Sequence, residues 1–228
     1  MNVTLETSLP KMVPVLPLDG HVLLPSAATP FRVSDPRHRR LVQDLLDRPF
    51  SERWVAVPPR VSQGARMPDV HDEEVAALGL ITVATPLEGG EFIVVVEGRS
   101  ACRLEALETT AHPFAVPYSI ARIRLLTDRP EPLRVARAAT TDLIQALFAL
   151  YESFGLAASE LPQSDLALDD IGLVYRIGSA VIEDPVARAM LLCERCPARR
   201  REYVQTHIVD QMAFAMREGL LGRKAPRC

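Results

Sequence analysis

Two cysteines, Cys193 and Cys196, are the strongest candidates for metal or redox chemistry in this 228-residue chain. They stand three apart in the segment Cys-Glu-Arg-Cys, and we expect both thiols on one face at the end of a helix. A structural zinc site needs four ligands, and neither Cys102 nor Cys228 supplies a second pair at the required spacing. A thioredoxin-like site needs this motif after a strand and at a helix start. We therefore interpret both thiols as packing residues and predict no metal and no cofactor.

The histidines and neighbouring carboxylates form no recognised catalytic or metal-binding pattern. The five histidines are His21, His38, His71, His112 and His207. Asp72 and Glu73 beside His71 belong to a polar segment, and we interpret the five imidazoles as ordinary surface or packed side chains. Asp169 or Asp170 is best explained as a helix start, because negative charge is favoured at a helix N-terminus. The sequence therefore indicates no catalytic residue.

Four arginines, Arg195 and Arg199 to Arg201, form a dense basic cluster. One interpretation is a solvated helix start with Glu194 and Glu202 as charge partners. The other is a contact with nucleic acid phosphates. Arginines at a helix start oppose the helix dipole, so either interpretation needs a compensating partner.

Composition describes an ordinary globular protein with enough apolar residues for a sizeable core. Apolar residues make up 48 % and charged residues 24 %, with a net charge of −3 and a pI near 6.0. This balance gives no general attraction to nucleic acid or anionic lipid. The start of the chain lacks the pattern of a signal peptide, and no apolar run could span a bilayer. Four unevenly placed cysteines suggest no disulfide framework. We expect a soluble, cytoplasmic protein.

The stretch from Gly79 to Leu107 predicts three short strands joined by two turns. Residues 81–84 are β-branched, and the paired glycines of 87–90 suit a tight turn. Residues 92–96 form a continuous apolar run, which predicts a strand buried on both faces. We expect Glu97-Gly98-Arg99 to bend the chain before an alternating strand over 102–106.

The rest of the first half is also rich in strands, with one helix. We expect extended segments at 13–18, 22–25, 30–33, 54–57 and 121–125. Ser34 or Asp35 caps a helix over 36–47, with Pro36 at its first position and one buried face. Residues 58–77 read as a long loop. We interpret Trp54 as a core residue.

The second half has the periodicity of helices. Apolar residues repeat at steps of three and four from Ala136 to Phe154, wide enough to bury much of that helix. Further helices are predicted from Asp169 or Asp170 to about Glu183, from Asp184-Pro185 to near Cys196, and from there to the glycines at 219 and 222. The period changes near Pro130 and Pro132, so we place a domain boundary there, with domains at 1–129 and 130–228.

The order of these segments resembles the amino-terminal substrate-recognition domain family of the Lon protease. The resemblance covers residues 12–126 well and extends loosely into the helices. It rests on these segments: Pro14-Val15-Leu16-Pro17-Leu18, Leu24-Pro25, Pro30-Phe31-Arg32-Val33, Gly79 to Ala84, and Val95-Val96-Glu97-Gly98-Arg99-Ser100-Ala101-Cys102-Arg103-Leu104. The last of these, a valine strand followed by Glu-Gly-Arg and an alternating strand, is the most specific.

The resemblance implies an α+β protein: a PUA-like β-barrel domain with one short helix, followed by an all-α four-helix bundle. In the protease, this region recognises unfolded or tagged substrates and carries out no chemistry. The sequence has no GxxxxGK[ST] phosphate loop. It also has no lysine suited to a Ser–Lys dyad, because Lys11 and Lys224 lie near the chain ends. We therefore expect no enzyme activity, and interpret the chain as a stand-alone protein without the ATPase and protease parts.

These observations favour a non-enzymatic protein- or peptide-recognition module, an adaptor or substrate-binding protein linked to proteolysis. The expected partners are unfolded or extended polypeptide segments, together with a protease or chaperone. The alternative is an RNA- or nucleotide-binding protein that uses the PUA-like surface and the cluster from Arg195 to Arg201. The sequence does not identify the residues that contact a partner.

Overall fold

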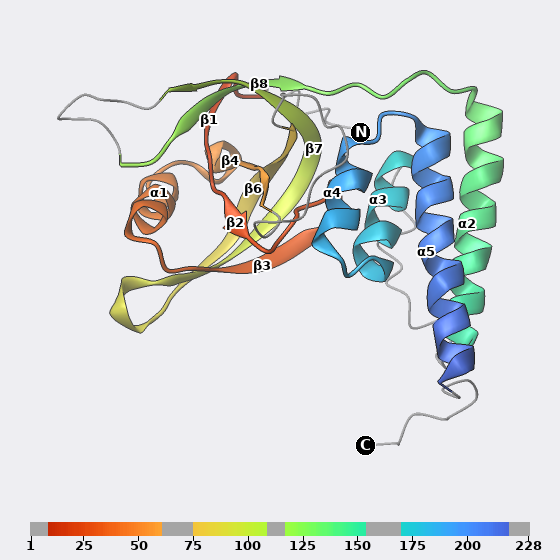
Figure 1. The fold of residues 1–228 in the computed structure, drawn as a ribbon. Coiled ribbons are helices and arrows are strands. Elements are labelled where there is room, and N and C mark those ends of the chain that lie inside the picture. Colours follow the sequence, from red (N-terminus) through yellow and green to blue (C-terminus); the bar gives the residue numbers. More distant parts are fainter. Residues whose placement is uncertain (1–8, 61–74, 109–116, 154–169, 219–228) are drawn as a thin grey trace, which may run out of the picture. The chain divides into compact units, whose positions relative to one another are not determined.

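The computed structural model describes residues 9–60, 75–108, 117–153 and 170–218. Its internal contacts divide the chain into two compact units, residues 1–126 and 127–228. In the described residues, the first unit is a strand-rich structure with one α-helix and the second consists of helices (Figure 1). The mixed α and β character expected from the sequence is confirmed, whereas the division into domains at 1–129 and 130–228 stays a prediction.

The first unit is organised around an antiparallel sheet with the strand order β1-β8-β7-β6-β4, to which β3 adds by pairing with β7. A second, parallel pair joins β2 to β5. The strands are β1 (Met12–Pro14), β2 (Leu18–Asp19), β3 (Ala28–Val33), β4 (Trp54–Val57), β5 (Pro59–Arg60), β6 (Val75–Pro86), β7 (Phe92–Glu108) and β8 (Ile120–Leu125).

The turn predicted over residues 87–90 is confirmed as the connection between β6 and β7. Gly89 and Gly90 have φ angles of 79° and 75°, a region that glycine enters without steric cost. The N–H of Leu87 donates to the carbonyl of Glu91 at 2.8 Å and closes the loop. On α1 (Pro36–Leu46), the Arg39 side chain donates to the Gly89 carbonyl at 2.7 Å and fixes the tip of this hairpin.

The second predicted turn, at residues 97–99, is wrong because β7 runs through it as one continuous strand. Leu78 pairs with Ser100 and Gly79 pairs with Gly98, so Arg99 is the extra residue of a β-bulge. Gly98 is required by close packing, since a Cβ there would lie 2.1 Å from the carbonyl oxygen of Leu24. A bulge and a turn have similar local sequences, which explains the error.

Two further expectations for this region need correction. The 92–96 run is buried on one face only, because Ile93 is 40 % exposed while Val94 and Val96 are fully buried. The segment expected to be a loop begins and ends in strands, with Pro59–Arg60 in β5 and 75–77 in β6. Residues 61–74, which include the acidic run, lie outside the described residues.

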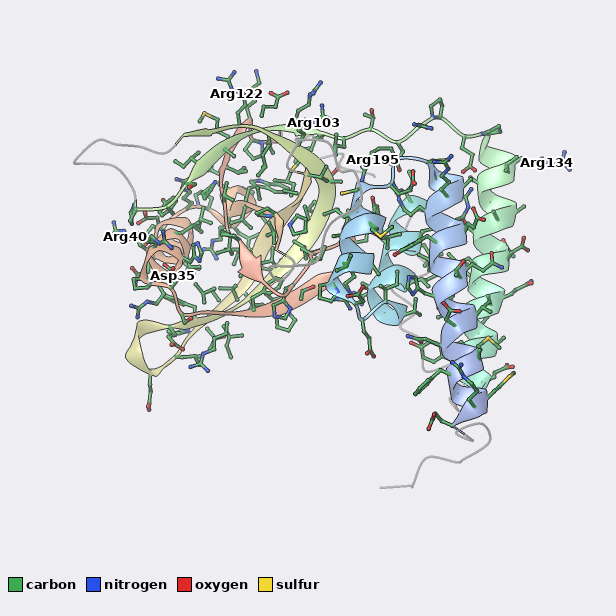
Figure 2. The ribbon with its side chains drawn as sticks, viewed as in Figure 1. Asp35, Arg40, Arg103, Arg122, Arg134 and Arg195 are labelled. Carbon is green, nitrogen blue, oxygen red and sulfur yellow. The ribbon has the colours of Figure 1, made fainter. Side chains whose placement is uncertain are left out.

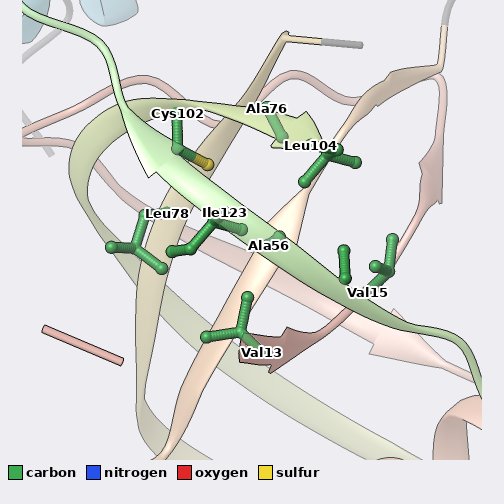
Figure 3. Packing of buried hydrophobic residues seen from close by; sticks show 9 residues of the cluster. Val13, Val15, Ala56, Ala76, Leu78, Cys102, Leu104 and Ile123 are labelled. Carbon is green, nitrogen blue, oxygen red and sulfur yellow. The ribbon is translucent and has the colours of Figure 1, made fainter. Parts of the chain in front are cut away.

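The closed barrel expected from the resemblance is not confirmed. The described antiparallel ladder ends at β1 and β4. Where these outer segments meet, a parallel bridge joins Val15 to Ala56, and the short β2–β5 pair follows in the same register. One hydrogen bond accompanies the bridge, from the Leu16 N–H to the Ala56 carbonyl at 2.9 Å. Figure 3 shows the side chains packed inside: Val13, Val15, Ala56, Ala76, Leu78, Cys102, Leu104, Ala121 and Ile123. The sheet is therefore curved around a core but not closed by a continuous ladder.

Helix α1 confirms the helix predicted over 36–47. Asp35 is its N-cap and accepts a hydrogen bond from the Arg37 N–H at 2.7 Å, with Pro36 next in the chain. Hydrogen bonds from the Arg37 side chain and backbone hold the pKa of Asp35 far below its usual range. Asp35 and Arg40 mark the surface of this helix in Figure 2. Its buried face consists of Leu41, Val42 and Leu45.

The second unit contains four α-helices within the described residues, as predicted. They are α2 (Leu133–Ser153), α3 (Asp170–Val181), α4 (Pro185–Cys193) and α5 (Pro197–Arg217), and α5 contacts the other three. Asp184 caps α4 by accepting from the backbone N–H groups of Val186 and Ala187. Gly219 and Gly222, which are expected to end the last helix, lie outside the described residues. No helix in the described part is both long and apolar enough to cross a membrane.

Candidate functional site

The two cysteines of the Cys-Glu-Arg-Cys segment do not share a helix, contrary to expectation. Cys193 is the last residue of α4, and Cys196 is the N-cap residue of α5. Between them the backbone is extended and not helical. Burial raises the pKa of the Cys193 thiol, which keeps it protonated. Burial also raises the pKa of Cys102 to about 12. Among the described residues, no group of three or more His, Cys, Asp or Glu side chains could hold a metal ion.

Two of the four clustered arginines, Arg200 and Arg201, are buried, which corrects both interpretations for these two side chains, whereas Arg195 is half-buried and Arg199 is exposed. Arg200 is 1 % exposed, and its two terminal nitrogens donate to the two carboxylate oxygens of Asp128 at 2.7 and 2.6 Å. Its guanidinium also lies 4.4 Å from the ring centroid of Tyr175. Arg201 is also buried and pairs with Glu131. Neither side chain is available to solvent or to a nucleic acid phosphate.

This arrangement explains how arginines are tolerated at the start of α5. Burial lowers the pKa of Arg200, but the hydrogen bonds and charge of Asp128 outweigh it and the pKa is raised. Arg200 also donates to the backbone carbonyl of Glu194 at 2.6 Å. The carboxylate of Asp128 thus neutralises the charge at the helix start.

The histidines that the structure describes with partners take part in packing. His21 lies edge-on to Phe31 with ring centroids 5.5 Å apart, and His207 lies edge-on to Tyr203 at 4.9 Å. His71, His112 and Asp169 lie outside the described residues. Asp170 is the first residue of α3.

The sheet carries an exposed apolar surface on its outer side, where β3, β7 and β6 lie next to one another. Pro30 pairs with Val95, and Val95 pairs with Val83, so these three side chains form one row across the strands. In the next row, Ile93 lies between Arg32 and Thr85. Val83 is 50 % exposed and Ile93 40 %. We call Pro30, Val83, Ile93 and Val95 the outer patch.

The opposite side of the same strands faces the core. Phe31 and Val94, the register neighbours of the outer patch, are 3 % and 0 % exposed. Side chains alternate across a strand, so core packing on one side fixes the positions of the patch residues on the other. The outer patch is therefore a preformed surface on regular secondary structure.

The family model of the "ATP-dependent protease La (LON) substrate-binding domain" matches residues 12–210. The chain belongs to the Lon substrate-binding domain family. No curated protein matches it. The matched region is a substrate-binding domain, and the comparisons indicate neither an ATPase nor a protease domain.

Two solved structures show the same fold. The N-terminal domain of the Mycobacterium avium complex Lon protease has 17 % identity and a TM-score of 0.66, covering 88 % of this chain and 99 % of that one. A Lon N-terminal domain protein from Xanthomonas campestris has 17 % identity and a TM-score of 0.55, covering 86 % of this chain and 97 % of that one.

The strand edges of this Lon-type domain are poor sites for an added strand. Along β3, the backbone N–H and C=O groups of successive residues point alternately toward β7 and away from it. The carbonyl of Ala27 points toward β7, because it accepts a hydrogen bond from the Gly98 N–H at 2.8 Å. Pro30 therefore belongs to the alternate set, whose backbone groups point outward. Proline has no N–H to offer there, which is a common protection of exposed strand edges.

The outer edge of β6 is protected in a similar way. Beyond Leu80, where pairing with β4 ends, the Ile81 N–H is already bonded to the Arg53 carbonyl at 3.0 Å. The register shift between Ile81 and Val83 disrupts the next position, and Pro86 closes the strand. A Lon-type domain of this form presents a sheet face more readily than a sheet edge.

The outer patch could not be identified from the sequence. The run at 92–96 reads as buried on both faces, and its exposed side is evident only when Pro30 and Val83 are aligned with Val95 in the sheet.

Proposed function

We propose that this protein binds non-native or extended polypeptide segments and acts as a substrate-recognition component in proteolysis. The observation that carries the proposal is the match of residues 12–210 to a substrate-binding domain. The sheet of this chain also exposes a preformed apolar surface. As an adaptor, it presents bound polypeptides to a protease or chaperone that supplies the energy and the cleavage.

Binding to an unfolded polypeptide tests this proposal directly. A disulfide-containing model protein is reduced, carboxymethylated and labelled with a fluorophore, and its anisotropy is followed as the full-length chain is added. We expect saturable binding in the micromolar range and much weaker binding of the same protein in its native, oxidised form. Equal affinity for both forms, or no binding of either, would contradict the proposal.

The role in proteolysis needs a second measurement, because binding alone does not establish delivery. The chain is added to a reaction containing an ATP-dependent protease from the source cell and the carboxymethylated polypeptide. An adaptor lowers the KM of degradation, whereas a holding protein slows degradation. A concentration-dependent slowing would restrict the function to polypeptide binding.

A further inference from the structure

We propose that the outer patch is the contact surface of this binding activity, and that it takes a short apolar polypeptide segment through side-chain contacts on the face of the sheet. This inference rests on the proposed function and adds the location of the site and the class of segment. The patch consists of Pro30, Val83, Ile93 and Val95, and its occupant is an uncharged apolar stretch of a non-native chain.

The layout of the patch is that of a small protein interface. Its centre is apolar, and an ion pair lies at each end. Arg32 pairs with Glu91 at 2.7 Å near the hairpin tip, and Arg99 pairs with Glu97 at 2.9 Å beside the bulge. The Arg32 and Arg99 side chains are 70 % and 45 % exposed, so they surround the centre without covering it. Apolar centres with polar rims are typical of recognition surfaces.

The size of the patch argues for a peptide and against a second copy of this chain. Three strands about 4.8 Å apart make the patch roughly 10 Å wide, and two rows of side chains make it about 7 Å long. A stable interface between folded proteins needs roughly 800 Å² on each side. A surface of about 70 Å² on these dimensions instead accommodates two or three apolar side chains, which suits a weak and sequence-tolerant contact with unfolded segments.

The protected edges decide the mode of binding. Strand addition needs a row of outward N–H and C=O groups, but β3 has Pro30 in that row and β6 has a bulge and Pro86. Affinity must then come from apolar side chains that enter the patch, so the bound segment needs apolar residues and not a particular backbone register.

A matched pair of substitutions tests the location of the site. Val83→Glu places a charge in the patch, and Val209→Glu places the same charge on α5, where Val209 is 55 % exposed. With the carboxymethylated polypeptide as probe, we expect at least tenfold weaker binding for Val83→Glu and less than twofold change for Val209→Glu. Equal affinities would overturn the site but leave the proposed function standing, whereas absent binding by the unmodified chain would remove both.

A milder variant covers the case in which Val83→Glu does not fold. Val83→Thr keeps the shape of the side chain and its preference for strands while adding a hydroxyl, and we expect two- to fivefold weaker binding with unchanged far-UV circular dichroism. Unchanged affinity in this folded variant would contradict the proposal. A dimer of the unmodified chain that Val83→Glu dissociates would also overturn it, because the patch would then be an interface between copies.

The mode of binding is tested by Pro30→Val, which restores an outward N–H on β3 while keeping an apolar side chain. We expect the affinity for the carboxymethylated polypeptide to stay within twofold. A tenfold gain would show that strand addition at this edge, and not the sheet face, governs binding.

Discussion

Arg200 and Arg201 lie inside the helical unit, although the sequence places four arginines within the seven residues from 195 to 201. Their partners, Asp128 and Glu131, are 72 and 70 residues away in the chain. In the sequence the nearest acidic residues are Glu194 and Glu202, so the cluster is compatible with a solvated helix start or with a nucleic acid contact, and its distant partners are not evident. The Asp35 cap was predictable because a cap and the helix that it begins are adjacent in sequence.

Tyr118 provides a prediction at the residue scale. Burial, together with the hydrogen bond to the Asp44 carboxylate at 2.9 Å, raises its pKa to about 12. An unfolded tyrosine has a pKa near 10. The folded state holds this proton more tightly, so the contribution to stability is complete below about pH 10 and is lost as the pH rises toward about 12.

The Tyr118→Phe variant isolates this effect, because Cys102 also has a raised pKa and changes stability in the same direction. Urea unfolding of both proteins is followed between about pH 9 and pH 12. The free energy of unfolding of the unmodified chain should decline more steeply above pH 10 than that of the variant. Parallel curves would contradict the assigned environment of Tyr118.

At the scale of elements, local signals predicted the helices better than the strands. Asp35-Pro36 and Asp184-Pro185 correctly mark the starts of α1 and α4, because capping depends on neighbouring residues. Strand β7 was divided in two because a Glu-Gly-Arg segment is compatible with a turn or a bulge. Only the pairing with β6 distinguishes the two, and that pairing is not visible in β7 itself.

The close packing of Gly98 in β7 against the backbone of Leu24 gives a testable prediction about stability. In Gly98→Ala the new methyl group would meet the backbone of Leu24, which cannot move aside as a side chain can. We expect a loss of about 1–3 kcal/mol in the free energy of unfolding, as for other overpacked sites. Arg99→Ala is the matched control: it removes only the exposed pair with Glu97 and should change stability by less than about 0.5 kcal/mol. Similar losses in both variants would show that the bulge, and not the contact with Leu24, is sensitive.

At the scale of the whole molecule, the family and the succession of strands and helices were evident from short motifs along the chain. The open line between β1 and β4 was not, because the pairing there depends on segments about 40 residues apart. The binding surface was hidden for the same reason, since its row joins Pro30, Val83 and Val95 from three strands. Location in the cytoplasm and the domain division at 1–129 and 130–228 stay predictions.

The independence of the two units is tested by substituting Arg200. Arg200→Met retains length but leaves the Asp128 carboxylate without its main partner, and we expect a loss of about 2–3 kcal/mol, less than for a fully buried pair because Asp128 keeps partial exposure. Trp54, the single tryptophan, packs against the core of the first unit. Its fluorescence therefore reports that unit.

The helical unit is followed by far-UV circular dichroism in the same urea titration. If the units unfold separately, Arg200→Met lowers the midpoint of the helical signal and leaves the Trp54 midpoint unchanged. Arg199→Met, at an exposed position of the same helix, should change neither. A joint shift of both probes would show that the chain unfolds as one cooperative structure.

The link between Val15 and Ala56 determines how the curved sheet keeps its form. Backbone pairing along that line is sparse, with one bridge at Val15 and Ala56 and the short β2–β5 pair further on, and each hydrogen bond of this kind contributes only about 1 kcal/mol. Separating the two edges of the sheet would expose the nine apolar side chains of the core cluster to water. The hydrophobic effect on these side chains therefore keeps the two edges of the sheet together, and truncation of core side chains should admit solvent first along this line.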